Sequence, residues 1–550
     1  MLERSTHCVL ELAMTLHLFD LGEWDRGATG VDPLLTSSVV NSGAHARGNA
    51  REDERMDADV SIKPVAAESI TTWDFESDVV VAGFGVAGAA AAVGASQAGA
   101  DVLVLERTGG WGGAASMSGG FIYLGGGTPL QKACGFDDSV DNMKAFMKAA
   151  LGPGVDEAKI DVYCEGSVDH YHWLAEDCGV RFKASFWSEP GWESPGDDGL
   201  QFTGGENAAP FSAVIPPAPR GHVPQMTDKH ASSDRGGGYM LMKPLTDKAS
   251  ELGVRSEYDV RVQALIVDRD GRVVGVRAKQ YGKDVAIHAR KGVVLATGSF
   301  AYNTTMVESF APRLVGRPAA SIEEHDGRAI RMAQSIGADI AHMDATEVAF
   351  FCDPQLLVRG VLVNGRGQRF INEDTYPGRI GQAVLIENQN QAFLVIDEAA
   401  YEEGCSRPTS SPQLRRQPTW VAETVEELES EMGLPAGALQ STVQLYNRHA
   451  VDRRDPLLGK SSEWVKPIGS PIAAIDLRGM TGGFTLGGLR TDTTGAVLQV
   501  SGEPIPGLFA AGRCTSGVSA GGYASGASLG DGSFFGRRAG DTAARHQPGS

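Results

Sequence analysis

The 550-residue sequence predicts an α/β protein, and the first indication is a short β-branched run at residues 78–82. Such a run is typical of a strand that is buried on both faces of a parallel sheet. A glycine-rich turn follows it, and then an alanine-rich segment up to Gly99 that favours a helix. A second apolar run, at residues 102–105, completes a strand–turn–helix–strand unit. This unit predicts a parallel sheet that is covered by helices.

The turn carries a GxGxxG pattern formed by Gly83, Gly85 and Gly88. In such a turn the first glycine permits the sharp bend, the second lets a pyrophosphate approach the backbone, and the third lets helix and strand pack closely. The free N–H groups at the start of the helix point at the phosphates. Glu106, about 20 residues beyond the glycines, ends the second strand and can accept hydrogen bonds from an adenosine ribose. These features predict a dinucleotide-binding site rather than an unspecific glycine-rich loop.

The length leaves room for more than one domain, and the composition argues against several classes of partner and site. A formal charge of −20 and a pI near 5.1 disfavour a nucleic-acid partner. No apolar run is long enough to cross a bilayer. The seven cysteines are scattered without a CxxC pair, which predicts a reducing, cytoplasmic location and no metal site.

Residues 1–70 differ in character from the rest of the chain and are predicted to form a disordered N-terminal extension. The apolar stretch at residues 8–19 is interrupted by Glu11 and His17, so it makes a poor signal peptide. The polar stretch that comes next has no periodicity. We therefore expect Met56 to be the natural start of the chain.

The segment after the second strand, residues 108–127, is dense in glycine, alanine and serine. Residues of this size let backbone amides and the hydroxyl groups of Ser116 and Ser118 close around a pyrophosphate and a ribityl chain. Farther on, apolar spacing predicts two helices within residues 140–180 and another over residues 240–252.

Residues 254–289 contain three runs of alternating apolar residues, with a turn at Asp270–Gly271, and predict an antiparallel meander. The meander leads into a buried strand at residues 293–296 and a turn at Thr297–Gly298. Near the C-terminus, an apolar run at residues 508–511 predicts one more buried strand.

In this order of elements the chain resembles the flavoprotein family of fumarate reductase, succinate dehydrogenase and the 3-ketosteroid dehydrogenases, over residues 74–545. The resemblance implies a Rossmann-like, two-dinucleotide-binding FAD domain at residues 71–339 and 467–545. It also implies an inserted α+β capping (catalytic) domain at residues 340–466. An HDG step before a helix is similar to the family's GDG–helix step, which implies that Asp326 lies near the cofactor.

Three later features favour FAD over NAD, since together they enclose one long, stationary cofactor: the GGAASMSGG loop, the ATG turn and the terminal strand–loop–helix. The last helix, expected to begin at Ala527 or Ser528, would direct its N-terminus at the flavin pyrimidine ring, where its partial positive charge stabilises anionic reduced flavin. The succinate dehydrogenase branch attaches its flavin to a histidine soon after the second strand. No histidine lies between Glu106 and Ser118, so we expect a non-covalent FAD.

The residues expected to bind FAD lie in these loops and turns and at their edges. They are Gly83, Gly85, Ala87, Gly88, Glu106, Arg107, Gly112, Gly113, Ala114, Ser116, Ser118, Gly119, Gly120, Val262, Thr297, Gly298, Asp326, Gly512, Arg513, Ser528 and Leu529.

Fumarate reductases hold a dicarboxylate with histidine and arginine side chains, and three of these anchors are missing here. After the RFINE segment that ends at Glu373, the family's arginine position is Pro377, and Arg379 is a nearby residue that could replace it. TGGF stands in place of a His-His pair, and SAGGYASG in place of the late HGxNR segment. A doubly charged substrate would lose hydration without gaining partners, which disfavours a dicarboxylate.

Tyr376, Tyr523 and Ser525 stand where the anchors would be, and uncharged hydroxyl groups suit a neutral, ketone-bearing, mostly apolar substrate. The GGYASG segment resembles that of the 3-ketosteroid Δ4-(5α)-dehydrogenases, whereas relatives that act on the 1,2-bond carry a YAGAG-like segment. Our mechanistic hypothesis is that Tyr523 accepts the C4 proton, that Ser525 relays it towards solvent, and that Tyr376 orients the ring and assists the transfer from the opposite side. The C5 hydrogen would leave as hydride to flavin N5, and N–H groups near Gly526 would polarise the 3-keto oxygen.

The predicted activity is therefore FAD-dependent desaturation of a 3-ketosteroid at the 4,5-bond, with an unidentified electron acceptor. A 3-ketosteroid Δ1-dehydrogenase is the first alternative, and product analysis distinguishes the two. The second is an enoate reductase of the fumarate reductase type, against which the missing anchors argue. The third is a non-catalytic flavin-binding or electron-transfer subunit, in which a dedicated capping domain would be hard to explain.

Overall fold

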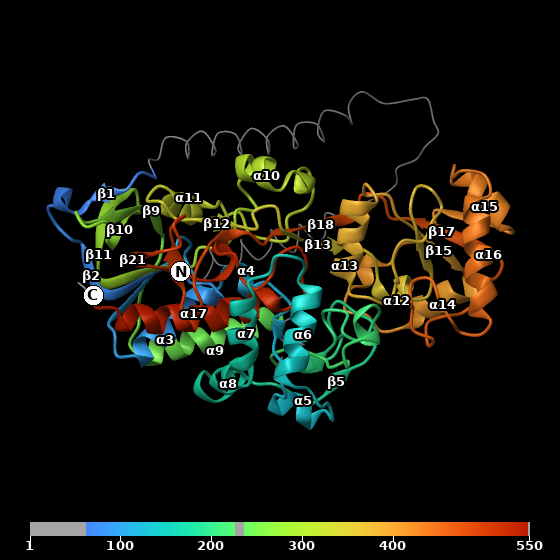
Figure 1. Cartoon of the computed structure of the whole chain (residues 1–550), viewed down its shortest axis with the longest axis horizontal. Helices are drawn as coiled ribbons and strands as arrows, with labels where there is room; N and C mark the ends of the chain where they lie inside the picture. The colour runs from blue at the N-terminus through green and yellow to red at the C-terminus, as the bar shows by residue number, and fades with distance from the viewer. Residues whose placement is uncertain (1–61, 226–235, 548–550) are drawn as a thin grey trace. The chain divides into compact units, whose positions relative to one another are not determined.

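The predicted strand–turn–helix–strand unit is present in the computed structural model (Figure 1). β2 spans Phe75–Ala82, α3 spans Val86–Gln97 and β3 spans Val102–Leu105. All of residues 86–95 in α3 are buried, because the helix lies between the sheet and a further layer of helix. β2 and β3 pair in parallel, which confirms the α/β class.

The structure describes residues 62–225 and 236–547. Most of the predicted N-terminal extension, including Met56, lies outside these residues. Its last part is ordered, because β1 (Val65–Ala66) pairs in parallel with the edge of the main sheet. Apart from Ile62, the described residues belong to one compact unit. In these two stretches no helix combines the length and the apolar character needed to cross a membrane.

A nine-stranded sheet forms the centre of the described residues. Its parallel part has the order β21–β11–β2–β3–β8, with β8 at Arg255–Glu257 and β21 at Pro504–Ala510. The predicted antiparallel meander consists of β9 (Val260–Val267), β10 (Val273–Gln280) and the first half of β11 (Lys283–Leu295). The carboxyl ends of the parallel strands therefore meet at one edge of the sheet, where ligands bind in folds of this class.

The last strand of the meander and the buried strand before the Thr297 turn, which the sequence predicts as separate elements, are one strand. β11 pairs with β2 along most of its length, while its other edge pairs first with β10 and then, from Val293 onward, with β21. A shift of register between Ala289 and Gly292 lets the strand pass from one partner to the other. The sequence conceals this continuity because the charged pair Arg290–Lys291 interrupts the apolar pattern at the shift.

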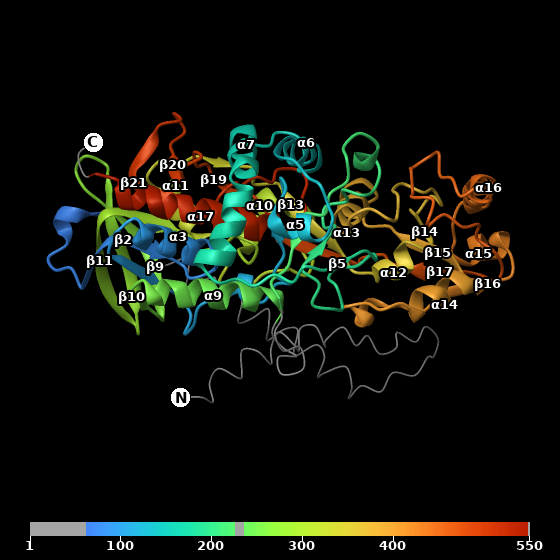
Figure 2. The same ribbon diagram turned by 90° about the horizontal axis from the view of Figure 1, so that it is seen from below.

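Two glycines bring the C-terminal helix against the helix of the dinucleotide unit. α17 spans Ala527–Arg545, and Figures 1 and 2 show it (red) beside α3 (blue), with α9 (Gly237–Glu251) also next to α3. A Cβ atom at Gly536 would lie 2.4 Å from the Ala87 carbonyl oxygen, and one at Gly540 would lie 2.0 Å from that of Ala91. Backbone contact at this distance needs glycine. It holds the N-terminus of α17 next to the GxGxxG turn.

The region predicted to hold two helices contains three. α6 spans Val140–Ala150, α7 spans Glu157–Glu165, and α8 spans Ser167–His172 and continues as a π-helical turn to Asp177. Gly166 separates α7 from α8, and a Cβ atom there would lie 2.6 Å from the Phe534 ring of α17. The break therefore lets this helical layer approach α17.

A four-stranded antiparallel sheet lies in the segment predicted to form the α+β insertion (orange in Figure 1). Its order is β14 (Val361–Val363), β15 (Phe393–Asp397), β17 (Ile472–Asp476) and β16 (Trp420–Ala422). Its helices are α12 (Pro354–Leu357), α14 (Glu398–Ser406), α15 (Val425–Glu431) and α16 (Ala438–Ala450). Because β17 is a central strand of this sheet, the segment that carries it continues to Asp476, beyond the expected end at residue 466.

Short elements connect these parts. They include α4 (Gly113–Ser116), β4 (Ile122–Tyr123), α5 (Pro129–Ala133), β5 (Phe186–Trp187), β6 (Leu200–Gln201), β7 (Gly221–His222), α10 (Thr304–Phe310), α11 (Arg328–Gln334), β12 (Ile340–Ala341), β13 (Thr346–Phe350), α13 (Pro377–Gln382), β18 (Thr481–Thr485), β19 (Gly488–Leu489) and β20 (Ala496–Leu498).

Candidate functional site

The three glycines of the GxGxxG turn are used in different ways. A Cβ atom at Gly83, whose φ is +102°, would lie 2.5 Å from the Ala296 carbonyl oxygen, and one at Gly88 would lie 1.9 Å from the Gly83 carbonyl oxygen. Both glycines therefore allow close packing within the protein. Gly85 differs, because the nearest atom to a Cβ there would be the Gly112 carbonyl oxygen at 3.9 Å. The space beside Gly85 is where a pyrophosphate can approach the backbone.

The glycine-rich loop after β3 lies opposite this turn. Gly112 donates its backbone N–H to the Phe84 carbonyl oxygen at 2.9 Å. A Cβ atom at Gly113 would lie 3.9 Å from the Gly85 Cα atom. The turn and the loop can approach each other this closely because neither carries a side chain at this point.

The other residues of this loop that are predicted to bind FAD also contact other parts of the chain. Ser116 and Ser118 donate their hydroxyl protons to backbone carbonyls three residues earlier, at 3.1 and 2.8 Å. Their oxygen atoms, rather than their protons, are therefore left to contact a ligand. A Cβ atom at Gly119 would meet the Glu193 carboxylate, and one at Gly120 would meet the backbone at the start of α9. Ala114 lies two residues before Ser116, in α4.

Glu106 is held at the end of β3 by hydrogen bonds to its carboxylate. Its Oε2 atom accepts from the Phe84 N–H at 2.8 Å, and its Oε1 atom accepts from the N–H and hydroxyl of Thr108, both at 2.9 Å. The side chain is only 8% exposed. A carboxylate has about four acceptor positions, so Glu106 is fixed in orientation and can still accept a ribose hydroxyl.

Asp326 lies in a cluster of arginines next to Glu106. Its Oδ2 atom is 3.0 Å from Arg107 and 3.3 Å from Arg261, and its Oδ1 atom accepts the Arg328 N–H at 2.9 Å. Val262 follows Arg261 on β9, the strand whose first N–H donates to the Glu106 carbonyl oxygen at 2.9 Å. Four predicted residues, from three segments that are far apart in sequence, therefore lie close together beyond β3.

The turn after β11, at Thr297–Gly298, packs against Gly83, the first glycine of the GxGxxG turn. The Thr297 Cα atom would lie 3.2 Å from a Cβ atom at Gly83. Gly298 packs against the His325 ring, whose Nε2 atom would lie 2.1 Å from a Cβ atom there. This contact explains why the residues that precede Asp326 lie close to the ATG turn.

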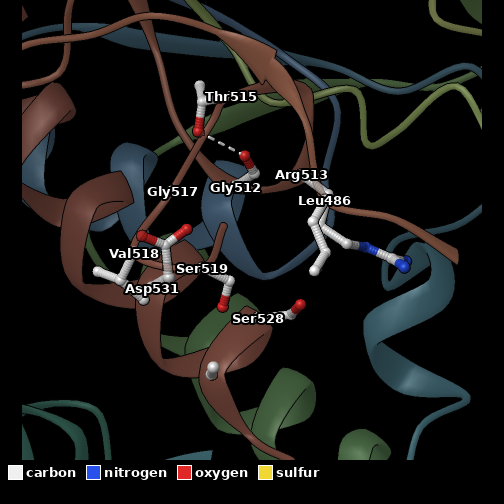
Figure 3. A pocket seen from close by; sticks show the side chains of 10 residues that line it. Leu486, Gly512, Arg513, Thr515, Gly517, Val518, Ser519, Ser528 and Asp531 are labelled. Carbon is white, nitrogen blue, oxygen red and sulfur yellow. Dashed lines mark hydrogen bonds between the residues drawn. The ribbon is translucent and has the colours of Figure 1, made fainter. Parts of the chain in front are cut away.

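A small cavity lies at the N-terminus of α17 (Figure 3). Three predicted cofactor residues line it, namely Gly512, Arg513 and Ser528, and Leu529 follows directly in the first turn of the helix. Ala87 approaches it from α3, since its Cβ atom would lie 2.7 Å from a Cβ atom at Gly512. The other lining residues are Leu486, Thr515, Gly517, Val518, Ser519, Ala527 and Asp531.

Asp531 is the residue of this cavity that sequence reasoning missed. Figure 3 shows its carboxylate beside Gly517 and Val518. It is 7% exposed, and its Oδ1 atom has no hydrogen-bond partner among the described residues. Burial raises the pKa of this carboxyl to about 6, although the buried ammonium of Lys159 opposes the shift. A buried oxygen without a partner, in a cavity beside a helix N-terminus, fits a site that receives a polar cofactor.

We expect Asp531→Asn to make the flavin-free protein less sensitive to rising pH. The pKa of Asp531 is raised from its ordinary value of 3.8 to about 6, so the folded state binds more protons than the unfolded state between these values. Stability therefore falls as pH rises from about 4 to about 6, and the loss persists above that range. The asparagine variant lacks this loss, so its free energy of unfolding relative to wild type should increase across the window.

Urea unfolding of the flavin-free protein at a series of pH values measures this difference. Asp541→Asn is a matched control on the same helix, because the Asp541 side chain is exposed and pairs with Arg545 at 2.9 Å. An Asp531→Asn variant whose stability relative to wild type is the same at every pH would contradict the assignment.

The structure brings the two predicted tyrosines together in one apolar cluster. Tyr376 and Tyr523, each 7% exposed, pack with Leu486 and Ala527 of the cavity wall. The Phe484 ring lies edge-on to Tyr523, with ring centroids 5.5 Å apart. Apolar walls around two phenols, adjacent to the cavity, suit a substrate with a ketone on a hydrocarbon body.

Ser525 lies near Tyr376, where it lowers the pKa of that phenol, and its backbone N–H donates to the Thr203 carbonyl oxygen at 2.9 Å. The Tyr523 hydroxyl accepts the Ser528 N–H at 3.2 Å, at the N-terminus of α17. Burial raises the pKa of Tyr523, while the contacts with Ser528 lower it. The helix N-terminus thus favours the ionised form of Tyr523 against the cost of burial.

One acid and one cation of the cluster were not expected beside the tyrosines. The Glu347 carboxylate, on β13, is 3.3 Å from the Tyr376 hydroxyl, and burial raises its pKa to about 8. Arg513, predicted only as a cofactor residue, lies 4.6 Å above the Phe484 ring, and burial lowers its pKa while Tyr523 and Glu347 oppose the shift. No motif marks Glu347, because in sequence it is one glutamate in an otherwise ordinary strand.

The arginines nearest to the missing dicarboxylate anchor have structural partners. Arg379, which could in principle have replaced that anchor, lies with its guanidinium 4.5 Å from the centre of the Phe211 ring. Arg369 of the RFINE segment is buried between Glu373 at 2.7 Å and Asp455 at 3.0 Å. This ion-pair network joins parts of the inserted segment to one another.

Comparison with known proteins connects this geometry to a family. The family described as FAD binding domain matches residues 78–529. The crystal structure of 3-ketosteroid-Δ4-(5α)-dehydrogenase from Rhodococcus jostii RHA1, in complex with 4-androstene-3,17-dione, is 71% identical. It superposes with a TM-score of 0.87, over 88% of this chain and 100% of that chain.

Two curated proteins are more distant relatives. A 3-oxo-5-alpha-steroid 4-dehydrogenase from Comamonas testosteroni is 29% identical over 507 residues, which cover 80% of this chain and 93% of that protein. A probable fumarate reductase from Shewanella frigidimarina is 29% identical over 515 residues, which cover 90% and 78%. The chain belongs to the FAD-binding flavoprotein family that includes the fumarate reductases and the 3-ketosteroid dehydrogenases, and its cofactor is FAD.

Proposed function

We propose that this chain is a 3-oxo-5α-steroid 4-dehydrogenase, which uses FAD to introduce a 4,5 double bond into 5α-reduced 3-ketosteroids. The observation that carries the proposal is the cluster of Tyr376, Tyr523 and Ser525 beside the cavity at the N-terminus of α17. The name of the 71% identical Rhodococcus jostii protein supports the same reaction. The electrons pass on to an acceptor that is still to be identified.

The two loops and the α17 cavity would hold the cofactor. Gly85 and Gly113 would face its pyrophosphate, Glu106 its adenosine ribose, and the first turn of α17 its flavin ring. Bound FAD would supply the hydride acceptor for the hydrogen that leaves C5 of the steroid. We propose the inserted segment, expected at residues 340–466 and extended by β17 to Asp476, as the capping domain over this site, and a cytoplasmic location for the protein.

The chain's own residues would bind the steroid and move the C4 proton. The Tyr523 oxygen, which the Ser528 N–H contacts, would accept that proton. Ser525 would pass it on, and Tyr376, whose pKa Ser525 lowers, would support the transfer. Backbone N–H groups near Gly526 would polarise the 3-keto oxygen, which makes the C4 hydrogen more acidic.

Anaerobic mixing with 5α-androstane-3,17-dione tests the proposed function. The flavin absorbance band should bleach, and the product should carry its new double bond between C4 and C5. A double bond between C1 and C2 would indicate a Δ1-dehydrogenase instead. Oxidation of a reduced dye by a small unsaturated acid, without bleaching by steroid, would indicate an enoate reductase. If neither substrate changes the flavin spectrum, a non-catalytic flavoprotein is indicated.

We expect acid precipitation to release all of the flavin into the supernatant, because we propose a non-covalent FAD. The segment between Glu106 and Ser118, which follows the second strand, contains no histidine that could attach the flavin. The measurement is the flavin absorbance of supernatant and pellet. Flavin that stays with the precipitated protein would contradict the proposal.

A further inference from the structure

Arg513 lines the cavity at the N-terminus of α17 and forms no ion pair there. Within the described part of the chain its guanidinium donates no hydrogen bond, and it lies over the Phe484 ring, 4.6 Å from the ring centre. Figure 3 shows the side chain extending away from the Asp531 carboxylate. Arginine stays protonated in proteins, so a full positive charge and five N–H donors lie at this cavity without a protein acceptor.

The arginines on the adenosine side of the proposed cofactor site are paired instead. Arg107 and Arg261 lie 3.0 and 3.3 Å from the Asp326 carboxylate. A cation that leaves water without gaining an acceptor costs free energy. The different state of Arg513 therefore points to a ligand that supplies the negative charge.

The acidic groups near Arg513 supply little of that charge at neutral pH. Glu347 interacts with Arg513, but burial raises the pKa of Glu347 to about 8, so this carboxyl is largely protonated below that value. Burial also raises the pKa of the Tyr523 phenol, which stays neutral. Asp531, on the cavity wall, interacts with the buried ammonium of Lys159. The charge of the Arg513 guanidinium is therefore not compensated by the protein.

The same cavity is where we place the flavin ring, because Arg513 shares its lining with Ala527 and Ser528, the first residues of α17. The oxidised ring is neutral. A hydride that is added to it leaves a negative charge on its pyrimidine half, at N1 and the C2 carbonyl oxygen. A nearby guanidinium stabilises that charge more than it stabilises the neutral ring. It would add a full charge to the partial charge of the helix N-terminus.

We propose that Arg513 raises the reduction potential of the bound flavin by holding the negatively charged pyrimidine half of reduced FAD. The inference goes beyond the proposed steroid reaction, and it rests on FAD as the cofactor and on the proposed place of the flavin ring. A flavin of raised potential accepts hydride more readily, which suits the removal of hydrogen from a saturated carbon.

The midpoint potential of the holoenzyme tests this assignment without any steroid. Arg513→Met and Arg513→Gln both remove the charge, and the methionine side chain can still pack on Phe484. In both variants the two-electron potential should fall by at least about 30 mV, which is a ~10-fold change in the equilibrium between oxidised and reduced flavin. Arg513→Lys keeps the charge and should stay closer to wild type. Titration with reference redox dyes, followed by flavin absorbance, measures the potential.

Sulfite gives a second reading on the same charge. The sulfur lone pair of sulfite forms a bond to flavin N5, and the electron pair displaced within the ring leaves a negative charge at N1 and the C2 carbonyl oxygen. No oxidant or further reactant takes part. Arg513→Met should bind sulfite at least ~10-fold more weakly than wild type, as measured by bleaching of the flavin band. Its release of oxidised FAD on dilution should match wild type, because the oxidised ring is neutral.

Arg537→Met is a matched control. Arg537 is on α17, and its guanidinium lies over the Trp173 ring, 4.9 Å from the ring centre. Burial lowers its pKa, as it lowers that of Arg513, but Arg537 is not among the residues that line the cavity. The control should keep the potential and the sulfite affinity of wild type.

The outcomes separate this assignment from the proposed function. Wild-type potential and sulfite affinity in Arg513→Met would overturn the role of Arg513. The same follows if Arg537→Met shows an equal fall, if Arg513→Lys falls as far as Arg513→Met, or if oxidised and reduced FAD are weakened by the same factor. If no 3-ketosteroid bleaches the wild-type flavin while Arg513→Met still lowers its potential, the proposed function fails and the role of Arg513 stands.

Discussion

Tyr523→Phe should slow the bleaching of the flavin by a 5α-reduced 3-ketosteroid by at least ~100-fold, the loss typical of a missing general base. The variant keeps the aromatic ring that packs against Phe484, so the cavity wall should stay in place. It loses the oxygen that the Ser528 N–H contacts at 3.2 Å, and with it the proposed acceptor of the C4 proton. Flavin content and steroid affinity should therefore change little while the rate falls.

Anaerobic stopped-flow absorbance measures the rate, and the flavin absorbance per protein measures cofactor content. Tyr163→Phe is a suitable control. Tyr163 is on α7, is buried against Phe534 and Phe535 of α17, and lies outside the tyrosine cluster. Its rate should match that of wild type. A Tyr523→Phe enzyme that bleaches at the wild-type rate would end the assignment of Tyr523 as the base.

Gly85→Ala should lose FAD while the flavin-free protein keeps its stability. In the structure the nearest atom to a Cβ atom at Gly85 is 3.9 Å away, so a methyl group meets no protein atom closely. It does occupy the space beside Gly85 in which we place the pyrophosphate. Losing a hydrogen bond between backbone and charged phosphate weakens binding by about 1.5–3 kcal/mol, which corresponds to ~10–100-fold in affinity.

Gly88→Ala is the informative comparison, because a Cβ atom there would lie 1.9 Å from the Gly83 carbonyl oxygen. That variant should lower the melting temperature of the flavin-free protein as well as its FAD content. Flavin titration and thermal unfolding of the two flavin-free proteins distinguish a blocked ligand site from a damaged turn. A Gly85→Ala protein with full FAD affinity would show that the pyrophosphate binds elsewhere.

Features that depend on neighbouring residues in the chain were predictable. The GxGxxG turn, the Glu106 position and the beginning of α17 follow from residue size and spacing over at most about 20 residues. The continuity of β11 was not predictable. One edge of that strand pairs first with β10 and then with β21. Only the assembled sheet shows that Ala289 and Gly292 belong to one strand.

The candidate site also has a part that could be predicted and a part that only the tertiary structure shows. The dinucleotide turn follows from the sequence alone. The resemblance to the family adds the replacement of its cationic anchors by Tyr376, Tyr523 and Ser525, from which a neutral ketone substrate is expected. The tertiary structure decided which hydroxyl each of these residues touches, and it added Glu347 and Asp531. Burial raises the pKa of Glu347 to about 8 and that of Asp531 to about 6. Burial is a property of the packed chain, so no local pattern of residues can reveal it.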